Sequence, residues 1–569
     1  MKTLARPILE PGKTCWVVSP VRSSGLLIDG RSYFRAFTEA AKAATRYLLI
    51  AGWQFDSDVS LLRGADREGE RGPVRFLDFL TSLCVARPEL RVVILCWDYS
   101  PAYMHDREWF QELVFRRRSG GRVSFRFDDR HALGASHHQK FVVVDGALAF
   151  VGSMDFCHER WDDRSHALEH PGRLEPSGVD VYGPYHEVQA FVTGPAVAEL
   201  RELFEARWRL AGGEDLELPE PLADLPATIR PDVRIAASEA GLSRTMARTL
   251  IPEHPSVREI EALYRGAIAS AESLIYIENQ YFGSMAVYEA LVRRLSEAGR
   301  PRLQVVLVYP RDLLSLTESI SMGASQNGMF RALRELAARS GHALGLYYSR
   351  SRGPGGAEKA RYIHSKLLLV DDRFLTVGSA NTNNRSMGLD SELNVSWEAS
   401  GDEAPALVRS LRRARISLLA EHAGLRPREA VEKLADIDGL VERLDRLADI
   451  PDGALRTRPV PAGADEKEWP GMDPAGPILE EEVFEAVAPP RIALWRSGIR
   501  RLTRAIGGRL RARRVLAVDP PGALARSPHP VWLTVSRGLW RAAFLSLALL
   551  LALLVGWGVT AALRALLDQ

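Results

Sequence analysis

The sequence predicts an α/β fold made of two similar halves within residues 1–400. Short apolar segments typical of strands alternate with amphipathic segments typical of helices, as expected for sheets covered on both faces. The same order of segments occurs twice, which predicts an internal duplication. The 569 residues and the 46% hydrophobic content suit a large ordered protein with more than one core.

The two predicted halves begin alike. A helix expected over residues 33–45 precedes one apolar strand, and a helix expected over 257–270 precedes another. The paired strand segments are YLLIAGWQF (47–55) with SLIYIENQYF (273–282), RVVILCW (91–97) with LQVVLVY (303–309), and KFVVVD (140–145) with KLLLVD (366–371). We therefore place the halves at residues 1–230 and 231–400.

Beyond residue 400 the composition changes three times. A helical apolar spacing predicts a cap over residues 401–450. Prolines and acidic clusters predict an extended linker over 451–490. An arginine-rich stretch over 491–515, with apolar residues three or four apart, predicts a basic amphipathic segment suited to an anionic membrane surface; a nucleic-acid arm is the alternative.

Residues 542–563 (AAFLSLALLLALLVGWGVTAAL) predict a transmembrane helix. An uncharged helix of this length spans ~33 Å, enough for a bilayer core of ~30 Å. The alternative is a buried core or oligomerisation helix. Arginines gather before the span, so we expect a membrane protein with one C-terminal span and its catalytic domain on the cytoplasmic side.

The net charge and the cysteine content limit the possible binding partners and the possible disulfide or zinc sites. The net charge of +2 gives no chain-wide nucleic-acid signature, so nucleic acid is not an expected partner. The four cysteines are too few and too irregular for a disulfide framework or a zinc ribbon, and we expect buried thiols at Cys15, Cys84, Cys96 and Cys157.

A spaced motif occurs once in each half. It consists of His138, Lys140, Asp145, Gly152 and Ser153 in the first half, and of His364, Lys366, Asp371, Gly378 and Ser379 in the second. If the motif begins on a strand, each histidine and the lysine two residues later face one ligand. The small Gly-Ser turn would let a ligand oxygen approach hydrogen-bond donors.

Two histidines and two lysines at one locus suit the chemistry of a phosphate diester. The lysines supply positive charge for the phosphate and its transition state. One imidazole can attack phosphorus while the other protonates the leaving alkoxide and then activates water or an alcohol. We expect no cofactor and no metal. Asp145 and Asp371 either orient the imidazoles or fix the strand turn.

The motifs resemble the paired HxKx4D motifs of the phospholipase D superfamily. The stretches at 127–162 and 363–395, with IYIENQYF at Ile275 and GPYHEV at Gly183, look like the phospholipase D branch in its shorter bacterial form. The resemblance implies two α-β-α sandwich halves related by a pseudo-twofold axis, with the active site between them. It also implies a covalent phosphohistidine intermediate and no metal requirement.

The resemblance also implies roles for individual residues. His138 would be the nucleophile and His364 the general acid and base, although the near symmetry allows the reverse. Substrate-binding residues are expected at Ser153, Asp155, Gln280, Ser379 and Asn381. Asp155 departs from the pattern, because the second half carries Asn381 at this position. Asp390 and Glu392 would hold the second histidine in register or form a plain salt bridge.

The predicted function is cleavage of glycerophospholipid headgroups to phosphatidic acid, with water or an alcohol as the acceptor. The predicted partners are a phospholipid membrane and its anionic headgroups, and the catalytic core is expected to be monomeric. The alternatives are a cardiolipin synthase-like phosphatidyltransferase and a phosphodiester nuclease, which the balanced charge disfavours. A lipid-binding scaffold without activity would be signalled by a lost histidine or lysine, and none is lost.

Overall fold

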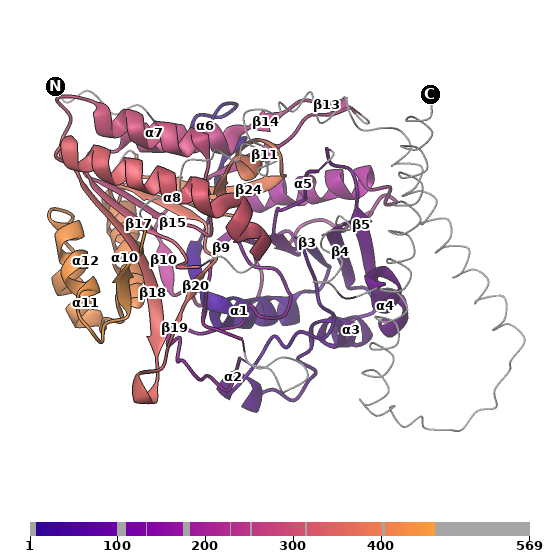
Figure 1. Ribbon diagram of the computed structural model, residues 1–569. Helices are drawn as coiled ribbons and strands as arrows, with labels where there is room; N and C mark the ends of the chain where they lie inside the picture. The colour runs from indigo at the N-terminus through magenta and orange to yellow at the C-terminus, as the bar shows by residue number, and fades with distance from the viewer. Residues whose placement is uncertain are drawn as a thin grey trace, which may run out of the picture. The chain divides into compact units, whose positions relative to one another are not determined.

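The computed structural model describes residues 7–98, 108, 110–132, 134–173, 182–227, 229–250, 253–312, 316–400 and 404–460, which lie in one compact unit. Two large mixed sheets with helices packed on them make up the unit (Figure 1). The predicted α/β fold class is therefore confirmed. The expected basic segment and membrane span lie outside the described residues. Among the described residues, no helix is long and apolar enough to cross a bilayer.

The first sheet has eight strands in the order β10-β2-β9-β7-β6-β3-β4-β5. The bounds are β2 Ser24–Ile28, β3 Tyr47–Gly52, β4 Arg91–Trp97, β5 Val123–Asp128, β6 Phe141–Val144, β7 Leu148–Gly152, β9 Val188–Thr193 and β10 Val233–Ile235. Strands β3, β4 and β5 are parallel, and the remaining neighbours are antiparallel.

The second sheet has eleven strands, nine of them in the order β1-β11-β24-β22-β21-β15-β17-β18-β19, with β14 paired to β11 and β25 to β18. The bounds are β1 Val17–Pro20, β11 Glu239–Met246, β14 Val257–Arg258, β15 Leu274–Glu278, β17 Gln304–Val308, β18 Ala343–Arg352, β19 Glu358–Ala360, β21 Leu367–Val370, β22 Phe374–Gly378, β24 Glu392–Glu398 and β25 Leu455–Thr457. From β11 to β18 this order and these directions repeat those from β2 to β5 in the first sheet. The duplication is thus visible in the topology.

Helices cover the outer face of each sheet (Figure 1). Helices α1 Asp29–Ala43, α3 Phe76–Ala86 and α4 Gln111–Arg118 share one hydrophobic core with the first sheet. Helices α6 Glu259–Ser270, α7 Met285–Ser296 and α8 Leu316–Arg339 do the same for the second sheet. The remaining helices are α2 Ala65–Glu68, α5 Ala196–Leu210, η2 Pro354–Gly356, α9 Asn384–Gly388, α10 Ala404–Ala423, α11 Pro427–Leu434 and α12 Leu440–Ala448.

The inner faces of the two sheets contribute to one central core. Alternate residues of a strand point to opposite faces. In β3, Leu48 and Ile50 lie in the outer core with α1, whereas Leu49 and Ala51 lie in the central core. The strands read as continuous apolar runs because both faces are buried. Strands β7 and β9 lie close to β22 and β24, so the two halves face each other where the motif strands end.

Three predicted boundaries need correction. Strand β10 belongs to the first sheet, so the first half extends past residue 230, and strand β1 crosses into the second sheet. Helices α10, α11 and α12 occupy the residues of the predicted cap. Residues at the start of the predicted 451–490 linker form β25, which pairs with β18. All four cysteines are buried free thiols, as predicted.

Candidate active site

The two motif histidines lie in extended segments just before β6 and β21, and not on the strands as predicted. Each segment is bound by the opposite half. The backbone N–H of His138 donates to the carbonyl of Ser391 at 2.9 Å, and that of His364 donates to the carbonyl of His186 at 2.9 Å. The second contact continues a short parallel ladder between β8 Tyr185–His186 and β20 Tyr362–Ile363. Both histidines are therefore held at the junction of the halves.

Each histidine donates from Nδ1 to a buried glutamate of the other half. His138 lies 3.0 Å from both carboxylate oxygens of Glu392, and His364 lies 2.6 Å from Oε1 of Glu187. The expectation that Glu392 holds the second histidine is wrong, because Glu392 holds the first. Glu187 is a site residue that sequence reasoning missed.

The Nε2 atoms of the two histidines remain available for chemistry. Within the described part of the chain, neither Nε2 has a hydrogen-bond partner. The His138 side chain is 16% exposed and that of His364 is 10% exposed, whereas the two glutamates are fully buried. A reacting group can therefore approach Nε2 while Nδ1 stays fixed by its carboxylate.

The motif serines support the glutamates instead of contacting a ligand. The hydroxyl of Ser153 donates to Glu187, and that of Ser379 donates to Glu392. Both serines are fully buried. Their predicted role in direct substrate binding is therefore corrected: they act on the histidines through the glutamates.

The motif glycines allow close strand packing. A Cβ atom at Gly152 would overlap the side chain of Gln189, and one at Gly378 would overlap Asn394. These neighbours lie on β9 and β24, so a larger residue would push the adjacent strand away. The glycines thus serve packing between strands, and not the approach of a ligand oxygen as predicted.

Each motif lysine bonds to the carbonyl of the histidine two residues earlier and also contacts a second side chain, which differs between the two halves. Lys140 Nζ donates to the carbonyl of His138 at 3.0 Å and lies 3.3 Å from Asp155. Lys366 Nζ makes the matching bond to the carbonyl of His364 at 2.6 Å and donates to Gln280 at 3.1 Å. The structure thus brings Asp155 and Gln280 to the site, where they hold the lysines.

Asn381 and Asp390 lie at the second motif. Within the part of the chain that the structure describes, Asn381 Oδ1 is buried without a hydrogen-bond partner, so this predicted substrate-binding side chain retains an unused polar atom. Asp390 accepts from the backbone N–H of Ser136 at 2.7 Å and from Arg385 at 2.7 Å. It therefore anchors the segment before His138, and contacts neither catalytic imidazole directly.

Asp145 and Asp371 fix strand turns, which was the second of the two predicted alternatives. The carboxylate of Asp145 accepts the backbone N–H groups of residues 45–47 at 2.7–2.9 Å, at the start of β3. Asp371 accepts those of residues 272–274 at 2.7–2.8 Å, at the start of β15. Their predicted catalytic role is therefore corrected to a structural one.

Burial and neighbouring charges shift the pKa values of the histidines, of Lys366 and of the two glutamates at the site. Burial, together with the lysines, holds the pKa values of His138 and His364 well below their usual range. Burial lowers the pKa of Lys366 to about 7, against the opposing charge of Glu187. Burial also raises the pKa of Glu187 to about 7 and that of Glu392 to about 8. An anionic phosphate would stabilise the protonated forms of the imidazoles and the lysine.

Arg160 is a further cation at the site that sequence reasoning missed. Its guanidinium lies 5.1 Å from the ring centroid of Tyr185, and that ring lies 5.5 Å from the ring of His364. Its charge also contributes to the low pKa of His364. The signal in the sequence was an arginine shortly after the first Gly-Ser turn.

Comparisons with known proteins find two matching family models and several relatives. Residues 40–294 match the family model described as "Phospholipase D", and residues 264–413 match "Cardiolipin synthase, PLD-like domain". Phospholipase D alpha 1 of Zea mays is 26% identical over 79% of this chain and 72% of its own length. Phospholipase D alpha 2 of Oryza sativa subsp. japonica is 26% identical over 78% and 71%.

Solved structures resemble the chain more distantly. The crystal structure of phosphatidylserine synthase from Haemophilus influenzae Rd KW20 aligns with a TM-score of 0.44 and 13% identity, over 76% of this chain and 94% of that one.

Proposed function

We propose that this phospholipase D-like enzyme hydrolyses glycerophospholipids to phosphatidic acid and a free headgroup, with transfer to an alcohol as a second outcome. The observation that carries the proposal is the pair of imidazoles, each fixed through Nδ1 by a carboxylate and each with a free Nε2. Lys140 and Lys366 lie beside them. A nucleophile, a proton donor and two cations are what phosphodiester transfer requires.

The first half-reaction forms a covalent intermediate. Nε2 of one histidine, His138 by the family resemblance, attacks phosphorus, and an N–P bond forms as the bond to the headgroup oxygen breaks. Nε2–H of the other histidine, His364, gives its proton to the leaving alkoxide. The Nδ1–H of His138 stays bonded to Glu392, which stabilises the positive charge that develops on the ring.

The second half-reaction regenerates the enzyme. His364, now neutral, takes a proton from water or an alcohol, whose oxygen attacks phosphorus. The N–P bond breaks and phosphatidic acid or a phosphatidyl alcohol leaves. The lysines stabilise the non-bridging oxygens in both steps, and Asp155 and Gln280 keep the lysine amines in place.

A phospholipid substrate fits the relatives and the sequence beyond the core. The plant relatives are phospholipases D by name. The expected basic segment at 491–515 and membrane span at 542–563 would anchor the enzyme to a bilayer, with its catalytic domain on the cytoplasmic side. Anchoring of this kind raises the effective substrate concentration at the site.

A phosphatidyltransferase of the cardiolipin synthase type is the second candidate. It is favoured by the match of residues 264–413 to the cardiolipin synthase model. The same two-step chemistry would serve it, with a second lipid in place of water as the acceptor.

The test uses the full chain reconstituted in vesicles of phosphatidylcholine, phosphatidylethanolamine or phosphatidylglycerol, with and without ethanol and EDTA. Mass spectrometry follows phosphatidic acid, phosphatidylethanol and cardiolipin. We expect EDTA-resistant phosphatidic acid and phosphatidylethanol that disappear in His138→Asn and in His364→Asn. His254→Asn is the matched control, because among the described residues the His254 ring bonds to the neighbouring carbonyl of Pro255 and to neither motif.

The other outcomes separate the alternatives. Cardiolipin formed from phosphatidylglycerol as the sole product would move the assignment to a phosphatidyltransferase. Cleavage of single-stranded DNA without any lipid product would overturn the lipid proposal.

A further inference from the structure

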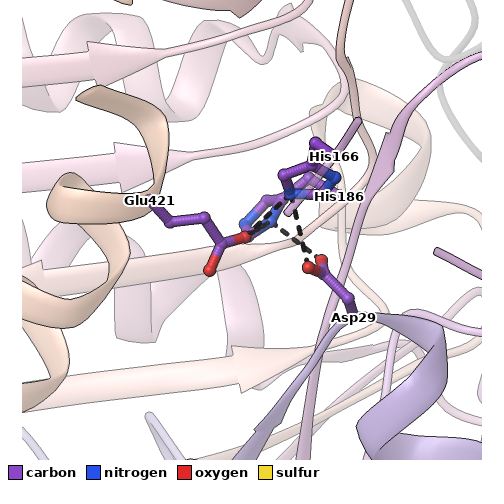
Figure 2. Close-up of side chains that lie close together, drawn as sticks. All are labelled: Asp29, His166, His186 and Glu421. Atoms are coloured by element: carbon purple, nitrogen blue, oxygen red, sulfur yellow. Dashed lines mark hydrogen bonds and ion pairs between the residues drawn. The ribbon is translucent and has the colours of Figure 1, made fainter. Parts of the chain in front are cut away.

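A second group of histidines and carboxylates lies buried away from the paired catalytic histidines. It consists of Asp29, His166, His186 and Glu421, which come from the start of α1, the loop before β8, β8 itself and α10 (Figure 2). The side chains are at most 1% exposed. Four segments of the described chain therefore meet at one site that is buried from solvent.

The carboxylate oxygens and imidazole nitrogens of the four side chains, which could each bind a metal ion, point toward one another. Glu421 Oε1 lies 3.0 Å from His166 Nε2 and 2.7 Å from His186 Nδ1. Asp29 lies on the other side, with Oδ2 3.3 Å from His166 Nε2 and Oδ1 3.1 Å from His186 Nδ1. With one possible ligand atom taken from each of the four residues, all four atoms lie within 4.8 Å of one another.

A zinc ion fits the size of this group. Zinc binds histidine nitrogen and carboxylate oxygen at about 2.0–2.2 Å, which makes the edges of a regular tetrahedron roughly 3.3–3.6 Å. The four nitrogen–oxygen separations here are 2.7–3.3 Å, so a bound zinc ion would require these ligands to move apart by less than about 1 Å.

The second oxygen of Asp29 is incompletely satisfied. Oδ2 of this residue is buried and lies 3.3 Å from His166 Nε2, but among the described residues it accepts no well-formed hydrogen bond. A buried carboxylate oxygen with incomplete hydrogen bonding is costly. A cation at the centre would satisfy it.

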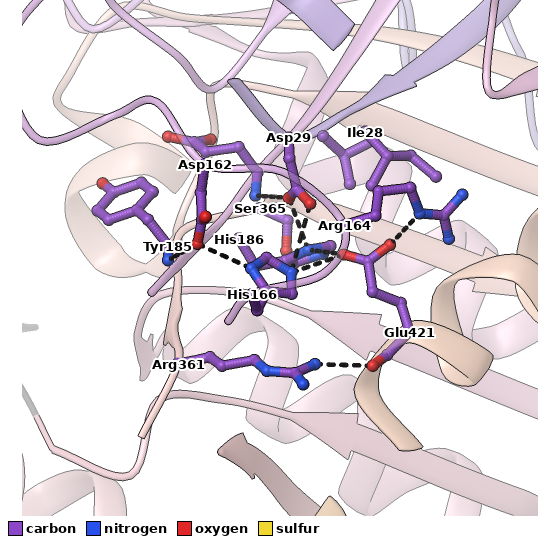
Figure 3. Close-up of polar contacts among 12 residues, drawn as sticks. Ile28, Asp29, Asp162, Arg164, His166, Tyr185, His186, Arg361, Ser365 and Glu421 are labelled. Carbon is purple, nitrogen blue, oxygen red and sulfur yellow. Dashed lines mark hydrogen bonds and ion pairs between the residues drawn. The ribbon is translucent and has the colours of Figure 1, made fainter. Parts of the chain in front are cut away.

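The outer nitrogen of each histidine is held by a further carboxylate, and Figure 3 shows Asp162 beside His166. His166 Nδ1 lies 2.9 Å from Asp162, and His186 Nε2 lies 3.1 Å from Glu278. Histidines that bind a metal through one nitrogen usually donate the other N–H to a carboxylate, which fixes the tautomer and the ring. Both imidazoles here are held in that manner.

The charges around the group are compatible with a divalent ion. Arg164 pairs with Glu421, Arg173 pairs with Asp162, and Arg361 donates to the carbonyl of Glu421. One divalent cation bound to two neutral imidazoles carries the same charge as two imidazolium rings without it. The ion can therefore replace two protons with no change in the net charge of the buried region.

We propose that Asp29, His166, His186 and Glu421 bind a structural zinc ion. Two nitrogen ligands disfavour magnesium and calcium, which prefer oxygen. Four protein ligands in a site closed to solvent favour zinc over metals that need added water ligands.

The ion takes no part in the reaction, but it supports one of the catalytic histidines. It would join α10 to β8, where the carbonyl of His186 accepts the backbone N–H of His364. The next residue, Glu187, binds the His364 ring. Zinc would therefore hold the segment that orients His364, and the proposal stands whether or not the lipid substrate is right.

The test measures the metal content of the full-length protein, purified without chelators, by inductively coupled plasma mass spectrometry. We expect about one zinc ion per chain in the wild type and less than about a tenth of that in Glu421→Gln and His166→Asn, because each variant loses one of four ligands. His170→Asn is the matched control: it lies on the same loop and pairs with Asp163 at 3.3 Å, outside the group. The control should keep its zinc.

A second measurement keeps the proposal testable if the variants fail to fold. Wild-type protein supplied with cobalt in place of zinc should show the strong visible absorption of four-coordinate Co²⁺, and X-ray absorption should give two nitrogen and two oxygen ligands at about 2.0–2.2 Å. Metal-free wild-type protein that is folded, and that takes up neither zinc nor cobalt, would show that the group is an ion-pair network and overturn the proposal. Calcium or magnesium as the bound ion would overturn it as well.

Discussion

His364 Nδ1 lies 2.6 Å from Oε1 of Glu187, although the two residues are 177 positions apart and belong to different halves. The same relationship holds in reverse between His138 of the first half and Glu392 of the second. Each half therefore supplies the carboxylate that orients the histidine of the other. Each catalytic imidazole is therefore oriented by a carboxylate only when the two halves pack face to face.

Replacing either glutamate should impair catalysis without removing a reacting group. In Glu187→Gln and Glu392→Gln the imidazole loses the carboxylate that sets its tautomer, and we expect kcat to fall roughly 10²–10⁴-fold, as for other histidine–carboxylate pairs. Steady-state kinetics with phosphatidylcholine measures this. A fall below tenfold in both variants would show that the carboxylates are not needed to orient the rings.

Replacing the aspartates of the two motifs should lower stability and leave catalysis nearly unchanged. Asp145→Asn and Asp371→Asn remove a charged acceptor from three backbone N–H groups. We expect each to reduce the free energy of unfolding by about 1.5–3 kcal/mol, with kcat within a few-fold of wild type below the transition. Thermal unfolding and kinetics on the same samples separate the two effects. Loss of kcat at unchanged stability would restore a catalytic role.

The glycine at the second motif should resist substitution. In Gly378→Ala the added Cβ meets the side chain of Asn394 and the carbonyl of Leu393, so we expect a loss of about 1–3 kcal/mol of stability from overpacking. Gly328→Ala is the control, since nothing lies within 4 Å of its added Cβ. Chemical denaturation compares the two variants. Equal stability of both would contradict the packing role.

The motifs were readable from the sequence because duplication repeats the spacing within each half. Histidine, lysine and aspartate stand at the same offsets in both copies, and so do the apolar strands that form β3 and β15. Contacts between the halves leave no such periodic trace. Glu392 follows Ser379 after 13 positions, whereas Glu187 follows Ser153 after 34, so the equivalence of the two glutamates was hidden. The buried zinc ligands were missed for the same reason, because they come from four separate segments.

Anion binding should weaken above the pKa of Lys366. That pKa is about 7 in the free protein, and the amine must be protonated to attract a phosphate. The affinity for sulfate, whose own charge is constant here, should therefore fall up to tenfold per pH unit above about pH 7. In Lys366→Arg the guanidinium stays charged, so this part of the pH dependence should disappear.

Isothermal titration calorimetry between pH 6 and 9 measures that affinity. Lys359→Arg on strand β19 is the control and should follow the wild type. An identical alkaline fall in Lys366→Arg would assign the titration to another group.

The central claim is that one of the paired histidines carries the phosphatidyl group during turnover. The most direct measurement mixes the full-length enzyme with phospholipid labelled at phosphorus, quenches the reaction under basic conditions, and maps the labelled peptide by mass spectrometry. We predict a base-stable, acid-labile phosphoramidate on His138 or His364, absent when the labelled histidine is replaced by asparagine. Phosphatidic acid production with no phosphoenzyme and no transfer to ethanol, or production that survives in both histidine variants, would contradict the account.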